Sequence, residues 1–317
     1  MFMMGMAGLA MAGPISYSYT TIVVPGATQV IANGINNAGD VVGDYNSNGF
    51  HGFLLDPMGN LQTIDFPGAQ TTVAEAINSS GEIVGGYIDS AGVVHGFLDN
   101  QGVFLTIDPP GSSFTVAYGI NASGQISGTQ SAGGGFVDVG SIFTTIAAPA
   151  GFSVTEVHAI NDAGDVVGFG NGVGFLDVNG SFSFIDVSGD SATEALGINN
   201  AGAVVGTDFG TSGGFLDFNG IISAINVPGS LFTGANGIDD QGRIAGYYTL
   251  GNCPIVQCGY IATPVPEPGL FAPVALSFLV LAAVLWRRGG GLSVSSVSVI
   301  MSLPKRRKME VTRILER

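Results

Sequence analysis

The chain has 317 residues, of which 51 are glycine, and only 10% of them are charged, with a formal net charge of −15. Such an acidic composition argues against binding to nucleic acid or to an anionic membrane surface, because both need Lys and Arg side chains. Apolar residues make up 46% of the sequence, enough for a folded core, and the glycine content with Val, Ile, Phe and Thr favours short strands and tight turns.

Charge is divided between two regions of the chain. Residues 13–263 contain 21 acidic side chains and a single basic one, Arg243, whereas residues 287–317 contain eight basic and two acidic side chains. The sequence therefore consists of an acidic body and a basic C-terminal tail.

The chain begins with a short apolar segment. Residues 1–12, MFMMGMAGLAMA, end in Ala10-Met11-Ala12, which has the small-x-small pattern of a cleavage site. No Lys or Arg precedes the apolar run, so the n-region of this signal is incomplete. The segment predicts a secretory signal peptide and export of the protein.

A motif that starts as GINNAGDVVGDY at residues 34–45 occurs six times in the body. Its isoleucine recurs every 38 to 43 residues, at Ile35, Ile77, Ile120, Ile160, Ile198 and Ile238. A period near 40 is the signature of a repeat architecture. In the second unit we expect strands at residues 72–78, 82–88, 95–98 and 103–108, and four short antiparallel strands per unit are typical of a propeller blade.

The two ends of the repeat array complement each other. The sixth unit stops after its third strand, near residues 259–263, and residues 18–28 match the fourth strand of the other units. Pairing of these segments predicts an all-β fold, a six-bladed β-propeller over residues 13–263 whose ring is closed by the N-terminal strand. A β-solenoid or sandwich is the alternative, although an open solenoid exposes two sheet edges that need protection.

The INxxGxIVG-like motif and the HGFL or GGFL that follows it, as at His51–Leu54 and His95–Leu98, resemble the HAF family of extracellular bacterial repeats. The resemblance covers nearly all of residues 18–263. It implies an exported repeat protein and transfers no catalytic pattern.

The C-terminal region contains a linker, an apolar span and a basic flank. Residues 264–269 form a Pro-rich linker, and residues 270–286 carry no charge, which predicts one transmembrane helix with its cytoplasmic side at the following arginines. This order resembles a PEP-CTERM sorting signal, whose motif falls on Pro266, Glu267, Pro268, Arg287 and Arg288. The resemblance implies an exosortase-type partner that processes the tail at the cell surface. Residues 287–317 run past the usual end of that family, either as a disordered basic cytoplasmic tail or as an extension of the gene prediction.

Two cysteines, Cys253 and Cys258, lie in the long loop at residues 250–257 and at its end. A local disulfide suits an exported protein, and free thiols or a metal pair are the alternatives. The metal pair has no nearby histidine to complete it. This loop differs most from the corresponding loops of the other units. We therefore expect any localised binding at this loop or at the blades of His51 and His95.

No catalytic constellation is visible in the sequence, and no cofactor is expected other than Ca²⁺. His51 and His95 share one repeat position, which is typical of packing or turn chemistry, and His158 has no visible partner. The recurrent Asp65, Asp108 and Asp186 are weak Ca²⁺ candidates, or they cap turns and keep strand edges soluble.

Two further features of the repeats concern the turns. The asparagines of turns such as Asn36-Asn37 are interpreted as turn formers. Arg243 occupies the repeat position of Asp40 and Asp165, and we expect it to pair at the surface with a carboxylate of a neighbouring blade.

Together these features predict a non-enzymatic, exported, surface-anchored propeller that acts as a structural or binding module of the bacterial envelope or extracellular matrix. Its expected partners are the exosortase, the membrane through the C-terminal helix, and extracellular polysaccharide or an envelope protein. A Ca²⁺-stabilised module without another ligand is a further interpretation. An enzyme acting on extracellular polysaccharide is the alternative, which carboxylates converging at one channel mouth roughly 5–10 Å apart would favour.

Overall fold

The computed structural model describes residues 15–131, 134–154, 156–187, 192–210, 213–249 and 253–265. The predicted signal peptide at 1–12, the sorting motif at 266–268 and 287–288, the membrane span at 270–286 and the tail to residue 317 lie outside these residues. The part of the chain that is described contains strands and turns but no helix, and hence no helix suited to crossing a membrane.

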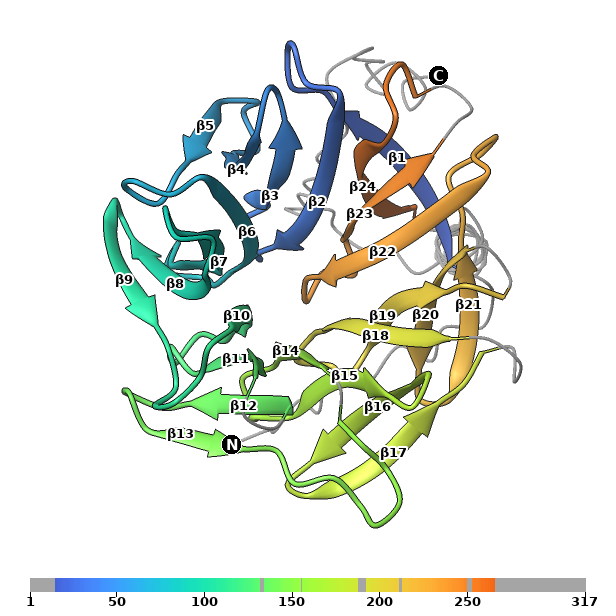
Figure 1. Ribbon diagram of the computed structural model, residues 1–317. Helices are drawn as coiled ribbons and strands as arrows, with labels where there is room; N and C mark the ends of the chain where they lie inside the picture. Colours follow the sequence, from blue (N-terminus) through green and yellow to red (C-terminus); the bar gives the residue numbers. More distant parts are fainter. Residues whose placement is uncertain are drawn as a thin grey trace, which may run out of the picture. The chain divides into compact units, whose positions relative to one another are not determined.

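Within the described residues the chain forms six four-stranded antiparallel sheets, arranged around a central channel (Figure 1). In five of them the strands follow one another from the channel outwards. The blades are β2 (Gln29–Ile35), β3 (Val41–Asn46), β4 (Phe50–Leu55), β5 (Leu61–Ile64); β6 (Thr71–Ile77), β7 (Ile83–Ile88), β8 (Val94–Asn100), β9 (Val103–Ile107); β10 (Thr115–Ile120), β11 (Ile126–Gln130), β12 (Gly134–Asp138), β13 (Phe143–Thr145); β14 (Glu156–Ile160), β15 (Val166–Gly170), β16 (Val173–Val178), β17 (Ser181–Ile185); and β18 (Thr193–Ile198), β19 (Val204–Asp208), β20 (Gly213–Phe218), β21 (Ile221–Ile225).

The sixth blade joins the two ends of the array. It contains β22 (Phe232–Ile238), β23 (Ile244–Thr249), β24 (Cys258–Val265) and, at its outer edge, β1 (Ser16–Ile22). The register of β1 on β24 runs from Ser16 opposite Val265 to Ile22 opposite Gly259. The predicted six-bladed ring and its closure by the N-terminal strand are therefore confirmed.

The last strand continues two residues into the segment assigned above to the linker. Pro264 and Val265 pair with β1, while the pairing of β23 with β24 ends at Ala262. Pro264 fits here because a proline, which lacks an N–H group, is accepted where a strand has no neighbour on one side.

Two motif positions build the core of every blade. An aromatic ring on the third strand lies opposite the glycine of the second strand, as Phe97 does opposite Gly85. A Cβ atom added to Gly85 would lie 2.0 Å from the carbonyl oxygen of Val73 and 2.8 Å from the Phe97 ring, so only glycine fits. The equivalent rings are almost fully buried: Phe53, Phe97, Phe136, Phe175, Phe215 and Tyr260.

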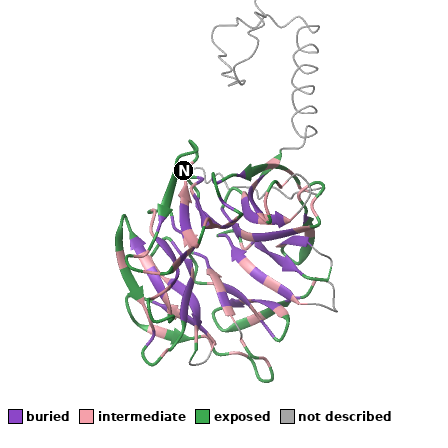
Figure 2. Ribbon diagram, turned by 45° about the horizontal axis from the view of Figure 1, so that its top comes forward, coloured by how far each residue is buried: buried purple, intermediate pink, exposed green. Residues whose placement is uncertain are grey.

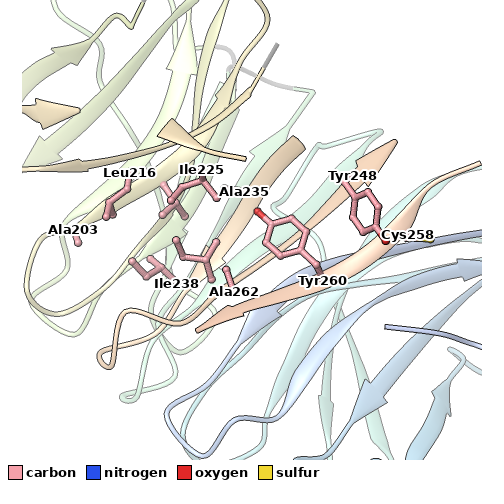
Figure 3. Packing of buried hydrophobic residues seen from close by; sticks show 11 residues of the cluster. Ala203, Leu216, Ile225, Ala235, Ile238, Tyr248, Cys258, Tyr260 and Ala262 are labelled. Carbon is pink, nitrogen blue, oxygen red and sulfur yellow. The ribbon is translucent and has the colours of Figure 1, made fainter. Parts of the chain in front are cut away.

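Adjacent blades share apolar clusters. Figure 3 shows the one between the fifth and sixth blades, where Leu216 and Ile225 pack with Ala235 and Tyr260. The Tyr260 hydroxyl donates a hydrogen bond to the carbonyl of Gly234 at 3.0 Å, so the only tyrosine in this ring of aromatics has its polar atom satisfied. Burial falls on the inner strands, and exposed residues gather on the outer strands and loops (Figure 2).

Candidate binding site in the propeller channel

The channel has two mouths separated by a ring of isoleucines. The motif isoleucine of each blade lines the channel and is 6–8% exposed. A small cavity of about 90 Å³ lies on each side of this ring of isoleucines. The mouth formed by the motif turns is called here the narrow mouth, and the opposite one the wide mouth.

At the narrow mouth the motif asparagines link the blades. The Asn78 side-chain oxygen accepts hydrogen bonds from the N–H groups of Ser80 and Glu82, both at 3.0 Å. Its nitrogen donates to the Glu82 carboxylate at 2.7 Å and to the carbonyl of Asn121 in the next blade at 3.2 Å. The same bond to the following blade is made by Asn36, Asn121, Asn161 and Asn199. These asparagines form turns as predicted and also bridge neighbouring blades.

The sixth blade has Asp239 in place of the asparagine, and a carboxylate cannot donate to the next blade. Arg243 pairs with the buried Asp239 carboxylate through Nε and donates from Nη2 to the carbonyls of Asn36 and Asn37 at 3.2 and 3.1 Å. The prediction that Arg243 pairs with a carboxylate of a neighbouring blade is therefore wrong. Its carboxylate lies in its own blade, because the guanidinium must supply the donor that Asp239 lacks.

A β-bulge occurs at the same place on each innermost strand. The register shifts there by one residue, which leaves that residue without a partner on the second strand. The bulged residues lie two positions before the motif isoleucine and line the wide-mouth side of the channel: Asn33, Glu75, Tyr118, His158, Leu196 and Asn236. Unlike the asparagines of the narrow mouth, these side chains differ from blade to blade.

The wide mouth holds a cavity of about 340 Å³, which is within the size range of small-molecule sites. Besides the bulged residues, its walls include Asp44, Thr207 and Tyr247, which occupy equivalent positions on the second strands of the first, fifth and sixth blades. Glu194 faces Thr207 across the strand pair of the fifth blade.

The loop that differs most from the corresponding loops of the other units contributes to this cavity through Gln257. Cys253 and Cys258 form a disulfide at its base. The loop docks on the first blade, since Val256 donates to the carbonyl of Thr28 and Val30 donates to the carbonyl of Gln257. The segment 250–252 lies outside the described residues.

Carboxyl groups of the cavity are poorly solvated. Burial raises the pKa of Glu75 to about 8, with the charges of Asp44 and Glu156 adding to the effect. The Glu75 side chain is half-buried and lines the cavity, where surrounding protein leaves its carboxyl group little contact with water. Burial also raises the pKa of Asp44 to about 6, although a hydrogen bond from Asn33 at 3.1 Å opposes the shift, and it raises the pKa of Glu194.

His158, for which the sequence shows no partner, belongs to a group at this mouth. Its Nε2 atom lies 3.0 Å from the Glu156 carboxylate, and its ring stacks on Tyr118 with 4.2 Å between centroids. The hydrogen bond from His158 lowers the pKa of Glu156, while burial and the nearby carboxylates raise the pKa of Tyr118. The negative charge of Glu156 therefore has a partner.

The Ca²⁺ candidates lie away from the channel, just after the outermost strands of three different blades. Asp65 and Asp108 contact the histidines of their own blades, at 3.0 Å from His51 and 2.6 Å from His95. Asp186 follows β17. Within the described ranges no group of three or more His, Cys, Asp or Glu side chains is arranged to hold a metal ion.

Sequence reasoning missed the bulged residues as site residues. In the sequence they stand directly before the motif, at a position that holds Asn, Glu, Tyr, His or Leu in the different units. Their orientation depends on the bulge, which the alternation of a regular strand does not predict.

No family model matches the chain, and no curated protein matches it. Among solved structures it is similar to virginiamycin B lyase from Staphylococcus aureus, with a TM-score of 0.48 and 12% identity over 79% of this chain and 100% of that one. It is also similar to a gluconolactonase from Xanthomonas campestris, with a TM-score of 0.47 and 13% identity over 81% of this chain and 96% of that one. A lectin from Aleuria aurantia matches with a TM-score of 0.43 and 10% identity over 79% of this chain and 100% of that one. Those activities are properties of the matched proteins.

Proposed function

We propose that the chain is an exported, surface-anchored propeller that serves as a binding module of the bacterial envelope or extracellular matrix, with its ligand in the wide-mouth cavity. The observation that carries the binding role is the cavity itself, where six bulges direct five kinds of side chain into one space. Holding the blades together does not require such variety. At the narrow mouth the blades are linked by almost uniform residues, five asparagines and one aspartate.

A melting experiment tests the binding role. The purified full-length chain would be melted with envelope polysaccharides, peptidoglycan fragments and envelope proteins, because a ligand that binds only the folded state raises the midpoint. Leu196→Trp fills the cavity and should abolish the shift, whereas Ser79→Trp, at the narrow mouth, should leave it unchanged. Equal shifts in both variants would place binding outside the cavity.

The proposed export and anchoring rest on the two ends of the chain, and the Cys253–Cys258 disulfide supports an oxidising compartment. An exosortase-type enzyme would act at the Pro266-Glu267-Pro268 motif. Fractionation of cells should find the mature chain at the surface, and a variant with these three residues changed to alanine in the membrane fraction. Recovery of the unaltered chain from the cytoplasm would contradict export.

A second candidate function is cleavage of extracellular polysaccharide. One observation favours it: Glu75, whose pKa burial raises to about 8, shares a channel mouth with the carboxylates of Glu156 and Glu194. Glycosidases use one protonated and one ionised carboxyl group in this way. Release of reducing ends by the chain, and its loss in Glu75→Gln, would support catalysis, while no release from the panel above would exclude it for those polymers.

A further inference from the structure

Two acidic walls face each other across the wide-mouth cavity. One contains Asp44 and Glu75, from the first and second blades, and the other contains Glu194, from the fifth blade. The second and fifth blades are opposite each other in a ring of six. Ligand groups that bind both walls must therefore span the cavity.

The carboxyl groups of these two walls have no ion-pair partner among the described residues. His158 is the only basic side chain among the described residues of the cavity wall; it is hydrogen-bonded to Glu156, and its charge opposes the burial that raises the pKa of Glu194. No described residue donates a hydrogen bond to the carboxyl group of Glu75 or Glu194. Arg243, the only Lys or Arg between residues 13 and 263, lies at the opposite mouth.

A second observation points to a missing partner. Thr207 lines the cavity beside Glu194 and is 2% exposed, yet its hydroxyl has no hydrogen-bond partner. Buried hydroxyl groups are normally paired, so an unpaired one in the wall of a cavity indicates a group that a ligand supplies.

The remaining walls suit an aliphatic cation. Tyr118, Tyr247 and Phe209 line the space between the acidic walls. Aromatic faces attract ammonium groups and also pack against methylene groups. The isoleucine ring lines the channel on the side away from the wide mouth, so we expect a ligand to enter and leave through the wide mouth.

We propose that the wide-mouth cavity binds a small aliphatic diammonium ion, an inference that rests on the binding role proposed for this cavity. One ammonium group would bind Glu75 and Asp44, and the other would bind Glu194 and the Thr207 hydroxyl. A metal ion is a poorer occupant, since no described group of ligands is arranged for one.

Binding must then depend on pH, because the first ammonium group needs an ionised Glu75. The groups that face Glu75 are Asp44 on β3, Tyr118 on β10, Glu156 and His158 on β14, Glu194 on β18 and Tyr247 on β23. Burial raises the pKa of Glu75 to about 8, so the carboxyl group must release a proton when the cation binds at pH 6. Linkage then weakens binding at least about tenfold at pH 6 relative to pH 8.5.

The experiment measures binding to the full-length chain by calorimetry in 150 mM salt, to suppress loose binding of cations to the acidic surface. The probes are 1,4-diaminobutane, butylamine, 1,4-butanediol and CaCl₂. We expect diaminobutane to bind at least tenfold more tightly than butylamine, and butanediol not to bind. Equal affinity for the diamine and the monoamine, or no binding of diaminobutane, would overturn the inference.

Two variants with the same chemical change locate the site. Glu75→Gln should weaken diaminobutane binding at least tenfold at pH 8.5 and reduce its pH dependence to the smaller part that the remaining carboxyl groups contribute. Glu82→Gln, at the narrow mouth, should change neither, and it is conservative because the third blade has Gln125 at this position. Equal loss in both variants, or in neither, would exclude the cavity as the diamine site.

The outcomes also separate this inference from the proposed function. Binding of CaCl₂ or butanediol that Glu75→Gln abolishes would keep the cavity as a binding site and refute the diammonium ion. The same conclusion would follow if an envelope polymer binds, Leu196→Trp abolishes that binding, and diaminobutane does not bind.

Discussion

The pairing of Asp239 with Arg243 should hold the last blade to the first at the narrow mouth. The Asp239 side chain is fully buried, and its second oxygen accepts hydrogen bonds from the N–H groups of Gln241 and Arg243. Replacing Arg243 by alanine leaves this carboxylate without its charge partner and removes the donors to the first blade. Breaking a buried pair costs about 3–5 kcal/mol.

The arginine side chain is 20% exposed, so water can reach the Asp239 carboxylate once Arg243 is removed. We therefore expect the cost of Arg243→Ala to lie at the low end of that range. For a domain of this size, 3 kcal/mol lowers the melting midpoint by about 6–12 °C. Unfolding in urea and thermal melting of the full-length chain measure the effect.

A double variant provides the control. Asp239→Asn together with Arg243→Asp copies the first blade, where Asn36 donates to Asp40 at 3.0 Å and to the next blade at 3.2 Å. Each single change should destabilise the chain, because Asp239→Asn leaves the partly buried guanidinium without its carboxylate and Arg243→Asp places two carboxylates side by side. The double variant should recover stability to within about 1 kcal/mol, and strict additivity of the single effects would refute the coupling.

Three other perturbations test the structure. Burial raises the pKa of Glu75 from 4.5 to about 8, so the folded chain keeps a proton that the unfolded chain releases in this window, and the free energy of unfolding should fall as pH rises from 4.5 to 8. Urea titrations at pH 5 and 8 should show this fall in the unaltered chain and a smaller one in Glu75→Gln. Changing Cys253 and Cys258 to serine should cost about 2 kcal/mol, since the disulfide closes a short loop, and dithiothreitol should lower the midpoint of the unaltered chain alone. Gly206→Ala should prevent recovery of folded protein, because the new Cβ would lie 1.9 Å from a carbonyl oxygen of β18, whereas Gly86→Ala, with its nearest atoms 3.5 Å away, should fold.

Much of the fold follows from comparing the repeats with one another. The strand expected at residues 72–78 is β6, Thr71–Ile77, and the one expected at 103–108 is β9, Val103–Ile107. The closure was predictable because the first and last units each lack what the other provides. Backbone pairing between strands determines these features. Turn glycines such as Gly81, with φ of 82°, show in the sequence where one strand ends and the next begins.

The site was less accessible to such reasoning. A strand with regular alternation would point Ala76 and Ala74 to one face and Glu75 to the other, and only the bulge between them sends Glu75 into the channel. Likewise, Asp239 and Arg243 are four residues apart in the sequence, but their joint role depends on the carbonyls of the first blade, some 200 residues away in the chain.

The two mouths show how a symmetric ring acquires a specific site. Where the task is the same at every joint, as at the narrow mouth, one residue type repeated around the ring suffices, and the exception at Asp239 requires Arg243 to compensate. Six identical side chains at the bulges would present the same chemistry in six directions and could not orient a ligand. Different residues at Glu75, Tyr118 and Leu196 break that symmetry without disturbing the strand pairing, because a bulged residue has no cross-strand partner to match. The bulge thus separates the positions that hold the ring together from those that are free to determine what it binds.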